Sequence, residues 1–214
     1  IVGFRSLYFK NKSKSVGCFH IVTEFCEQGT LAKYSHADTE APLKAEREQV
    51  RRWAEQLFTG LQYLHQYNII HRDLKPNNVG LSKDNEIKIL DFGMSSRPGS
   101  TFIDDEYNGF GFFQAPEYLY RTGYNAKVDI WSAGLTLISL FLDPFKGFDR
   151  HDEDIFKWNL SKYHGLRNVH DIEMAVGEDA WSLIKHCLEF TAQQRSSAGE
   201  LLDNDWLDDS HEHC

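Results

Sequence analysis

The chain has 214 residues, of which 41% are hydrophobic, a length that suits one substantial core better than two domains. Its 32 acidic and 23 basic side chains give a formal charge of −9, which argues against nucleic-acid binding and favours basic protein partners. The cysteines are scattered without metal-ligand spacing, so we expect reduced thiols and a cytoplasmic or nuclear protein. The longest mostly apolar run, residues 130–142, is shorter than the roughly 20 residues of a membrane span and predicts a buried helix.

Two short apolar and aromatic runs open the chain, at residues 2–9 and 18–25. The polar stretch between them predicts an antiparallel hairpin. Lys10, Lys12 and Lys14 fall in its turn, where we interpret them as a solvated basic loop. The first residue is Ile1 rather than methionine, which suggests a piece of a longer product.

A helix is predicted over residues 48–67, because Val50, Trp53, Leu57 and Leu61 recur at helical spacing and form one apolar face. Short strands follow, and they bracket polar turns. These strands are expected at residues 69–70, 79–81 and 87–90. The remainder of the chain predicts further helices, at residues 126–142, 152–160, 178–190 and 197–202.

The first polar turn, residues 71–78, reads His-Arg-Asp-Leu-Lys-Pro-Asn-Asn. Phosphoryl transfer needs an acceptor for a hydroxyl proton, a cation beside the phosphate and oxygen ligands for magnesium. Asp73, Lys75 and Asn78 supply these groups in that order. An ordinary solvated turn would explain any one of these residues, but not the whole octet.

The octet resembles the H-R-D-x-x-x-x-N catalytic loop of eukaryotic protein kinases. Asp91-Phe92-Gly93 follows an apolar strand and is similar to the metal-binding DFG motif, and Ala115-Pro116-Glu117 comes at the spacing of the family's A-P-E. The resemblance implies an α+β protein kinase-like fold with a partial β small lobe and a mostly α-helical large lobe. It divides the chain into small-lobe strands and hinge at residues 1–28, the large lobe at 29–207 and an acidic tail at 208–214.

The same resemblance implies ATP and Mg²⁺ as ligands and a protein as substrate. Asn78 and Asp91 would bind the metal, and Thr23 would stand in the gatekeeper position before the adenine-binding backbone of Glu24 and Cys26. The alternative for Thr23 is a plain strand former. Gly80 would lie under the adenine ring, where a small residue leaves room.

Structural roles also follow from the resemblance. Asp129 matches the buried aspartate that holds the catalytic-loop backbone, and Arg195 matches the late arginine that pairs with Glu117. A buried pair of this kind is costly to break on one side. Phe4, His71 and Phe92 resemble three links of the stack of side chains that runs through active kinases.

Lys75 is typical of the serine/threonine class, although Phe110 stands where those kinases usually carry a threonine. Residues 88–93 and 124–132 look most like mitogen-activated protein kinases of the CMGC group. In those kinases the places of Asp105 and Tyr107 hold the phosphorylated threonine and tyrosine. Arg72 would then bind a phosphate on this segment, and the Asp105 carboxylate would be a weaker substitute for a phosphate. An upstream activating kinase would act on Tyr107. A solvated acidic loop is the alternative, and for the acidic tail a flexible end is weighed against a docking site for basic peptides.

The Gly-rich loop and the strand lysine that grip the nucleotide phosphates do not occur in these 214 residues. Two hypotheses of different class therefore stand side by side. One is a serine/threonine kinase that has these elements upstream of Ile1, with the isolated chain inactive. The other is a catalytically inactive kinase-fold module that acts as an interaction scaffold. Retention of the catalytic-loop residues and Asp91 favours the first.

Overall fold

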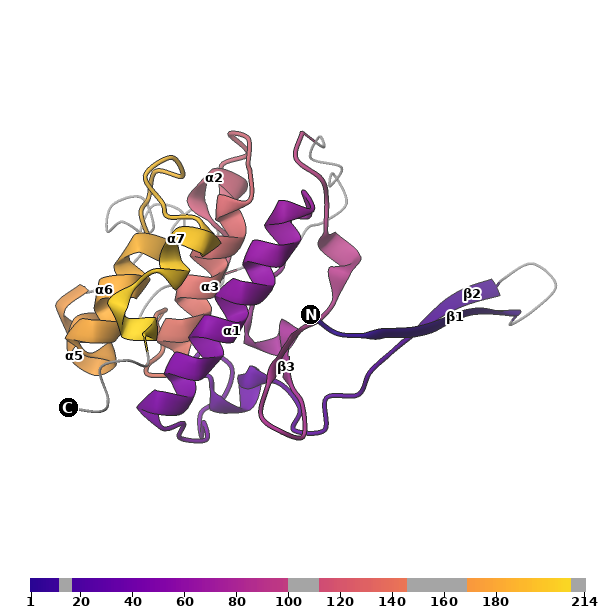
Figure 1. Cartoon of the computed structure of the whole chain (residues 1–214), viewed down its shortest axis with the longest axis horizontal. Coiled ribbons are helices and arrows are strands. Elements are labelled where there is room, and N and C mark those ends of the chain that lie inside the picture. Colours follow the sequence, from indigo (N-terminus) through magenta and orange to yellow (C-terminus); the bar gives the residue numbers. More distant parts are fainter. Residues whose placement is uncertain (12–16, 100–111, 146–168, 209–214) are drawn as a thin grey trace.

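The helical part of the molecule is built around two helices, α1 (Arg47–Gln66) and α3 (Lys127–Ser139). The computed structural model describes residues 1–11, 17–99, 112–145 and 169–208. Helix α1 packs against α3 on one side and α7 (Ala198–Leu202) on the other, and α6 (Glu178–Cys187) packs on α3 (Figure 1). Two further helices lie within these described residues, α2 (Pro116–Leu119) and α5 (Val169–Val176), and α5 packs on α6.

Helix α1 confirms the predicted amphipathic pattern, because its apolar stripe is fully buried. The stripe includes Trp53, Leu57, Phe58 and Leu61. The helix stops before Asn68, which adopts a left-handed conformation with φ 56°. Asparagine tolerates this conformation better than most residues, so the chain can turn there toward the catalytic loop.

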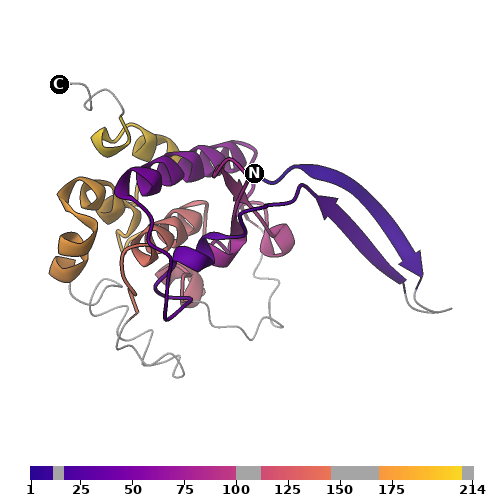
Figure 2. The same ribbon diagram turned by 90° about the horizontal axis from the view of Figure 1, so that it is seen from below.

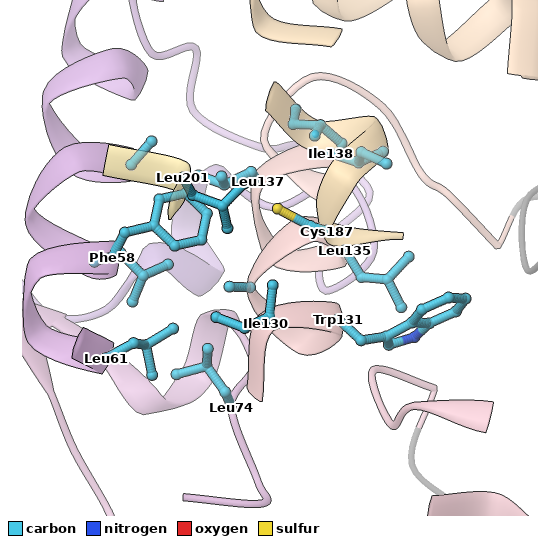
Figure 3. Packing of buried hydrophobic residues seen from close by; sticks show 14 of the residues in the cluster. Phe58, Leu61, Leu74, Ile130, Trp131, Leu135, Leu137, Ile138, Cys187 and Leu201 are labelled. Carbon is cyan, nitrogen blue, oxygen red and sulfur yellow. The ribbon is translucent and has the colours of Figure 1, made fainter. Parts of the chain in front are cut away.

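Helix α3 differs from α1 because every residue from Val128 to Ser139 is buried. A helix that is buried all round belongs at the centre of a core. Figure 3 shows Ile130, Trp131 and Leu135 of this helix among side chains from its neighbours. Gly134 permits the close crossing with α6, since a Cβ there would lie 2.7 Å from the Cβ of Cys187.

Two small antiparallel sheets carry the strands. Strand β1 (Phe4–Asn11) pairs with β2 (Gly17–Thr23), and β3 (Val79–Leu81) pairs with β4 (Ile87–Ile89), as the sequence predicts. The β1–β2 hairpin projects away from the helices in both views (Figures 1 and 2). One of its faces carries two cross-strand apolar pairs, Leu7 with Ile21 and Phe9 with Phe19, all more than half exposed.

In the part of the chain that the structure describes, four short 3-10 helices link these elements, and they span Leu31–Tyr34, Pro76–Asn78, Phe92–Met94 and Asp205–Leu207. The helix expected at residues 152–160 lies outside the described residues, and residues 69–70 form a single bridge from Ile70 to Ser96 instead of a strand. Within the described ranges, no helix combines the length and the apolar character that crossing a bilayer would require.

Candidate active site

The backbone of the catalytic loop is hydrogen-bonded to the buried carboxylate of Asp129, at the start of α3. Its two oxygens accept hydrogen bonds from the backbone N–H of His71 (2.9 Å) and of Arg72 (2.8 Å). Arg72 has φ 68°, an uncommon conformation for a residue with a Cβ. Charge-assisted hydrogen bonds from these amides to a carboxylate with no exposed surface stabilise this strained turn.

His65 is a third partner of Asp129 that the sequence analysis did not single out. Its Nε2 lies 2.9 Å from the carboxylate oxygen that also accepts the His71 amide. The signal available in the sequence was its place in the last turn of α1, next to the buried stripe. Helix α1 therefore contacts the same anchor as the catalytic loop.

Asp73, Lys75 and Asn78 meet in one cluster. The Lys75 ammonium lies 2.9 Å from each oxygen of the Asp73 carboxylate, and the Asn78 amide nitrogen donates to the Asp73 carbonyl at 2.7 Å and to its carboxylate at 2.9 Å. The Asp73 side chain is 19% exposed, so a substrate can reach it. A carboxylate held by two donors has a fixed direction, as a proton acceptor requires.

Asp91 lies beside this cluster, because the N–H of Leu90 donates to the carbonyl of Asn78 at 2.9 Å. Asp91 is in the left-handed region with φ 56°, and one carboxylate oxygen accepts the N–H of Gly93 at 3.1 Å. The Asn78 amide uses its nitrogen on Asp73, so its oxygen is the atom that it could offer to a cation. One amide oxygen and one carboxylate are the hard ligands that Mg²⁺ prefers, so the donor set fits this metal.

His71 and Phe92 stack edge to face with ring centroids 5.2 Å apart. His71 Nε2 lies 2.7 Å from the carbonyl of Leu90, and its Nδ1 accepts the Asp73 amide at 3.3 Å, so the neutral ring carries its proton on Nε2. Phe4, expected in the same stack, is instead 66% exposed on the hairpin. The sequence predicted an apolar strand there but could not show which element would cover it.

The expected adenine-binding segment follows β2. The N–H of Glu24 donates to the Gly3 carbonyl and its carboxylate accepts the Gly3 amide, both at 2.8 Å, while its own carbonyl accepts a long 3.3 Å bond from the Thr23 hydroxyl. The space expected beside Gly80 is taken up by Cys26, because a Cβ on Gly80 would lie 2.6 Å from its sulfur. Partial burial, together with Glu24 and Glu27, raises the pKa of the Cys26 thiol.

Glu117 and Arg195 form a bidentate pair, with nitrogen–oxygen distances of 2.7 and 3.1 Å. The Arg195 side chain is completely buried and also donates to the carbonyls of Lys127 and Glu189. The pair joins α2 to the segment that precedes α7.

Arg72, expected to catch a phosphate, donates to the Met94 carbonyl and, at 3.1 Å, to the hydroxyl of Tyr124. It therefore contacts the chain just beyond Asp91. Asp105, Tyr107 and Phe110 lie outside the described residues.

Comparison with known proteins agrees with this geometry. The family model described as the protein kinase domain matches residues 4–207. Similar curated proteins include the mitogen-activated protein kinase kinase mkk2 of Aspergillus fumigatus, 27% identical over 91% of this chain and 40% of the relative, and calcium-dependent protein kinase 4 of Plasmodium falciparum, 33% identical over 71% and 29%. The serine/threonine-protein kinase atg1 of Dictyostelium discoideum is 29% identical over 88% of this chain and 27% of the relative. The chain thus spans less than half the length of these relatives.

Proposed function

The chain belongs to the protein kinase domain family, and we propose that it transfers the γ-phosphate of ATP to serine or threonine hydroxyls of protein substrates. One observation carries this proposal. The Asp73 carboxylate is fixed by Lys75 and Asn78, and the Asn78 carbonyl accepts the N–H of Leu90, the residue before Asp91. These residues would supply the proton acceptor, the cation and the two oxygen ligands that phosphoryl transfer requires.

In the proposed reaction the substrate hydroxyl hydrogen-bonds to Asp73, and its oxygen attacks the γ-phosphorus of ATP in line with the leaving ADP. Asp73 takes the hydroxyl proton, and the Lys75 ammonium stabilises the charge on the transferring phosphate. Asn78 and Asp91 would hold Mg²⁺, which neutralises charge on the phosphates when it is bound. The backbone of Glu24 and Cys26 would bind adenine, with Thr23 behind it. Gly80 packs against the Cys26 side chain, so it would support this segment and not contact the adenine ring.

Serine/threonine specificity is proposed from Lys75, two residues after Asp73, and from the similarity to the Dictyostelium serine/threonine-protein kinase. The net charge of −9 favours basic substrate sequences. Arg72, Asp105 and Tyr107 would regulate the site, and an upstream kinase would act on Tyr107. The relatives named above are kinases of several kinds, so the resemblance to mitogen-activated protein kinases remains a prediction.

The test uses protein made from the complete coding sequence and measures transfer of labelled phosphate to a basic protein rich in serine and threonine. We expect Asp73→Asn to lower turnover by about 10²-fold or more while nucleotide binding persists, because a proton acceptor is lost but no metal ligand. Asp91→Asn should weaken magnesium-dependent nucleotide binding. Asp84→Asn, in the exposed turn between β3 and β4, is the matched control. Phosphate transfer by the wild type no higher than the background seen with Asp73→Asn would refute the proposal in favour of a non-catalytic module.

A further inference from the structure

Tyr124 links the catalytic loop to the chain that follows Asp91. Its hydroxyl accepts a hydrogen bond from the Arg72 guanidinium at 3.1 Å and lies 3.2 Å from the Ser96 hydroxyl. The Arg72 guanidinium also donates to the carbonyl of Met94. One hydroxyl therefore contacts both the catalytic loop, at Arg72, and the segment after Asp91, at Ser96.

The ring of Tyr124 is itself held in place. The Arg72 guanidinium lies over the ring at 5.6 Å, and the ring packs edge to face against Tyr118 with centroids 5.4 Å apart. Tyr124 lies in the loop before α3, whose Asp129 accepts the Arg72 amide. The backbone of Arg72 and its side chain are thus fixed from the same helix and the loop that leads into it.

Ser96 is a fixed point on the other side. Its backbone exchanges two hydrogen bonds with Ile70, at 2.8 and 2.9 Å, next to the catalytic loop. Together these bonds close a ring of contacts through Ile70, Arg72, Tyr124 and Ser96. Arg72, one member of this ring, directly precedes Asp73. Ser96, another member, comes five residues after Asp91.

We propose that the Tyr124 hydroxyl is a positioning group for phosphoryl transfer, which holds the segment after Asp91 against the catalytic loop. This inference rests on the proposed kinase activity. It goes beyond it, because Tyr124 touches neither substrate nor metal and acts only through Arg72 and Ser96. Asp73 directly follows Arg72, and Asp91 comes three residues before Met94, so loosening either bond shifts a carboxylate of the site. Small shifts of reacting groups lower turnover strongly even where binding persists.

The discriminating variant is Tyr124→Phe, which keeps the ring over Arg72 and against Tyr118 and removes only the hydroxyl. We expect kcat for peptide phosphorylation to fall by about tenfold, as the loss of a hydrogen bond to a charged group predicts, with KM for ATP and for peptide within about twofold of wild type. Tyr67→Phe, at a position 61% exposed at the end of α1, controls for loss of a tyrosine hydroxyl.

The second measurement is hydrogen exchange at the Ser96 amide, which is bonded to Ile70. In Tyr124→Phe this amide should exchange faster, while amides in the middle of α1 stay as protected as in wild type. Unchanged kcat, or unchanged exchange at Ser96, would overturn the proposal. A wild-type protein that transfers no phosphate would instead contradict the proposed function. In that case the exchange measurement would still decide whether Tyr124 holds the segment.

Discussion

Arg195 donates two hydrogen bonds to Glu117 across 78 residues of sequence, and its guanidinium also lies 5.0 Å over the ring of Trp131. Because the Arg195 side chain has no exposed surface, the cation cannot recover water if its partner is removed. The pair therefore ties α2 to the core in a way that a surface ion pair could not.

Glu117→Ala should lower the free energy of unfolding by about 3–5 kcal/mol, because it leaves a buried cation without its carboxylate. Urea denaturation followed by tryptophan fluorescence measures the change. Glu86→Ala removes a carboxylate that is 58% exposed and 3.5 Å from Lys88, and it should cost less than about 1 kcal/mol. An equal loss of unfolding free energy in both variants would contradict the larger contribution expected of the buried pair.

Gly134→Ala in α3 should destabilise the fold more than Gly60→Ala in α1. At Gly134 the added carbon meets the Cβ of Cys187 at 2.7 Å, and a Cβ cannot move without the backbone of α6. At Gly60 it meets only the tip of the Ile89 side chain, at 2.9 Å, which can rotate away. We expect a loss of about 1–3 kcal/mol for Gly134→Ala, and a change within about 1 kcal/mol for Gly60→Ala, where better helix propensity offsets the contact. Chemical denaturation of both variants gives the comparison, and a reversed order would refute the tight crossing.

Gly80→Ala should weaken both folding and nucleotide binding, because the new methyl collides with the Cys26 sulfur at 2.6 Å and with the Leu90 side chain at 2.9 Å. The double variant Gly80→Ala, Cys26→Ala removes the sulfur and should recover part of the loss. Thermal unfolding with and without magnesium-ATP measures both effects in the single and double variants. If the second change gives no recovery, the sulfur is not what fills this space.

Glu48 supports the start of α1 and should make stability depend on pH. Hydrogen bonds of 2.7 and 2.8 Å from the buried Arg51 lower the pKa of Glu48 from its ordinary 4.5. The folded pKa lies below the unfolded one, so the contribution is fully present above the unfolded pKa and is lost as the pH falls through the folded pKa. Glu48→Gln should therefore be less stable than wild type near neutral pH, and the difference should shrink as the pH falls below 4.5. Denaturation between pH 3 and 7 checks this, with the exposed Glu55→Gln as control, and a constant difference across that range would contradict it.

The sequence predicted much of this architecture, because periodicity fixes which face of an element is apolar. Helix α1 and the strands β3 and β4 appear within two residues of their expected limits. Helix α5 was missed, since its eight residues mix polar and apolar side chains without a long stripe. Phe4 was expected in a stack but is exposed, because an alternating pattern does not reveal what packs against a strand.

Some residues of the candidate site could be identified from the sequence, and others could not. The octet and Asp91 could be recognised because their chemistry requires particular residues at fixed, short spacing. His65 and Tyr124 could not, since their partners Asp129 and Arg72 lie 64 and 52 residues away in sequence. His65 belongs to no motif, and Tyr124 opens the 124–132 stretch without a role assigned to it there. Only the folded chain shows what each one contacts. The roles assigned to the site residues remain predictions until the variants are measured.

The attachment of the catalytic loop to Asp129 has a consequence for how the protein opens. The amides of His71 and Arg72 are bonded to a carboxylate on the most deeply buried helix, so neither proton reaches solvent unless α3 separates from the loop. Most loops open locally at little cost in free energy, but we expect that this catalytic loop does not. Its exchange rate should follow the unfolding of the whole helical core, and the loop would then lose its shape only when the molecule unfolds globally.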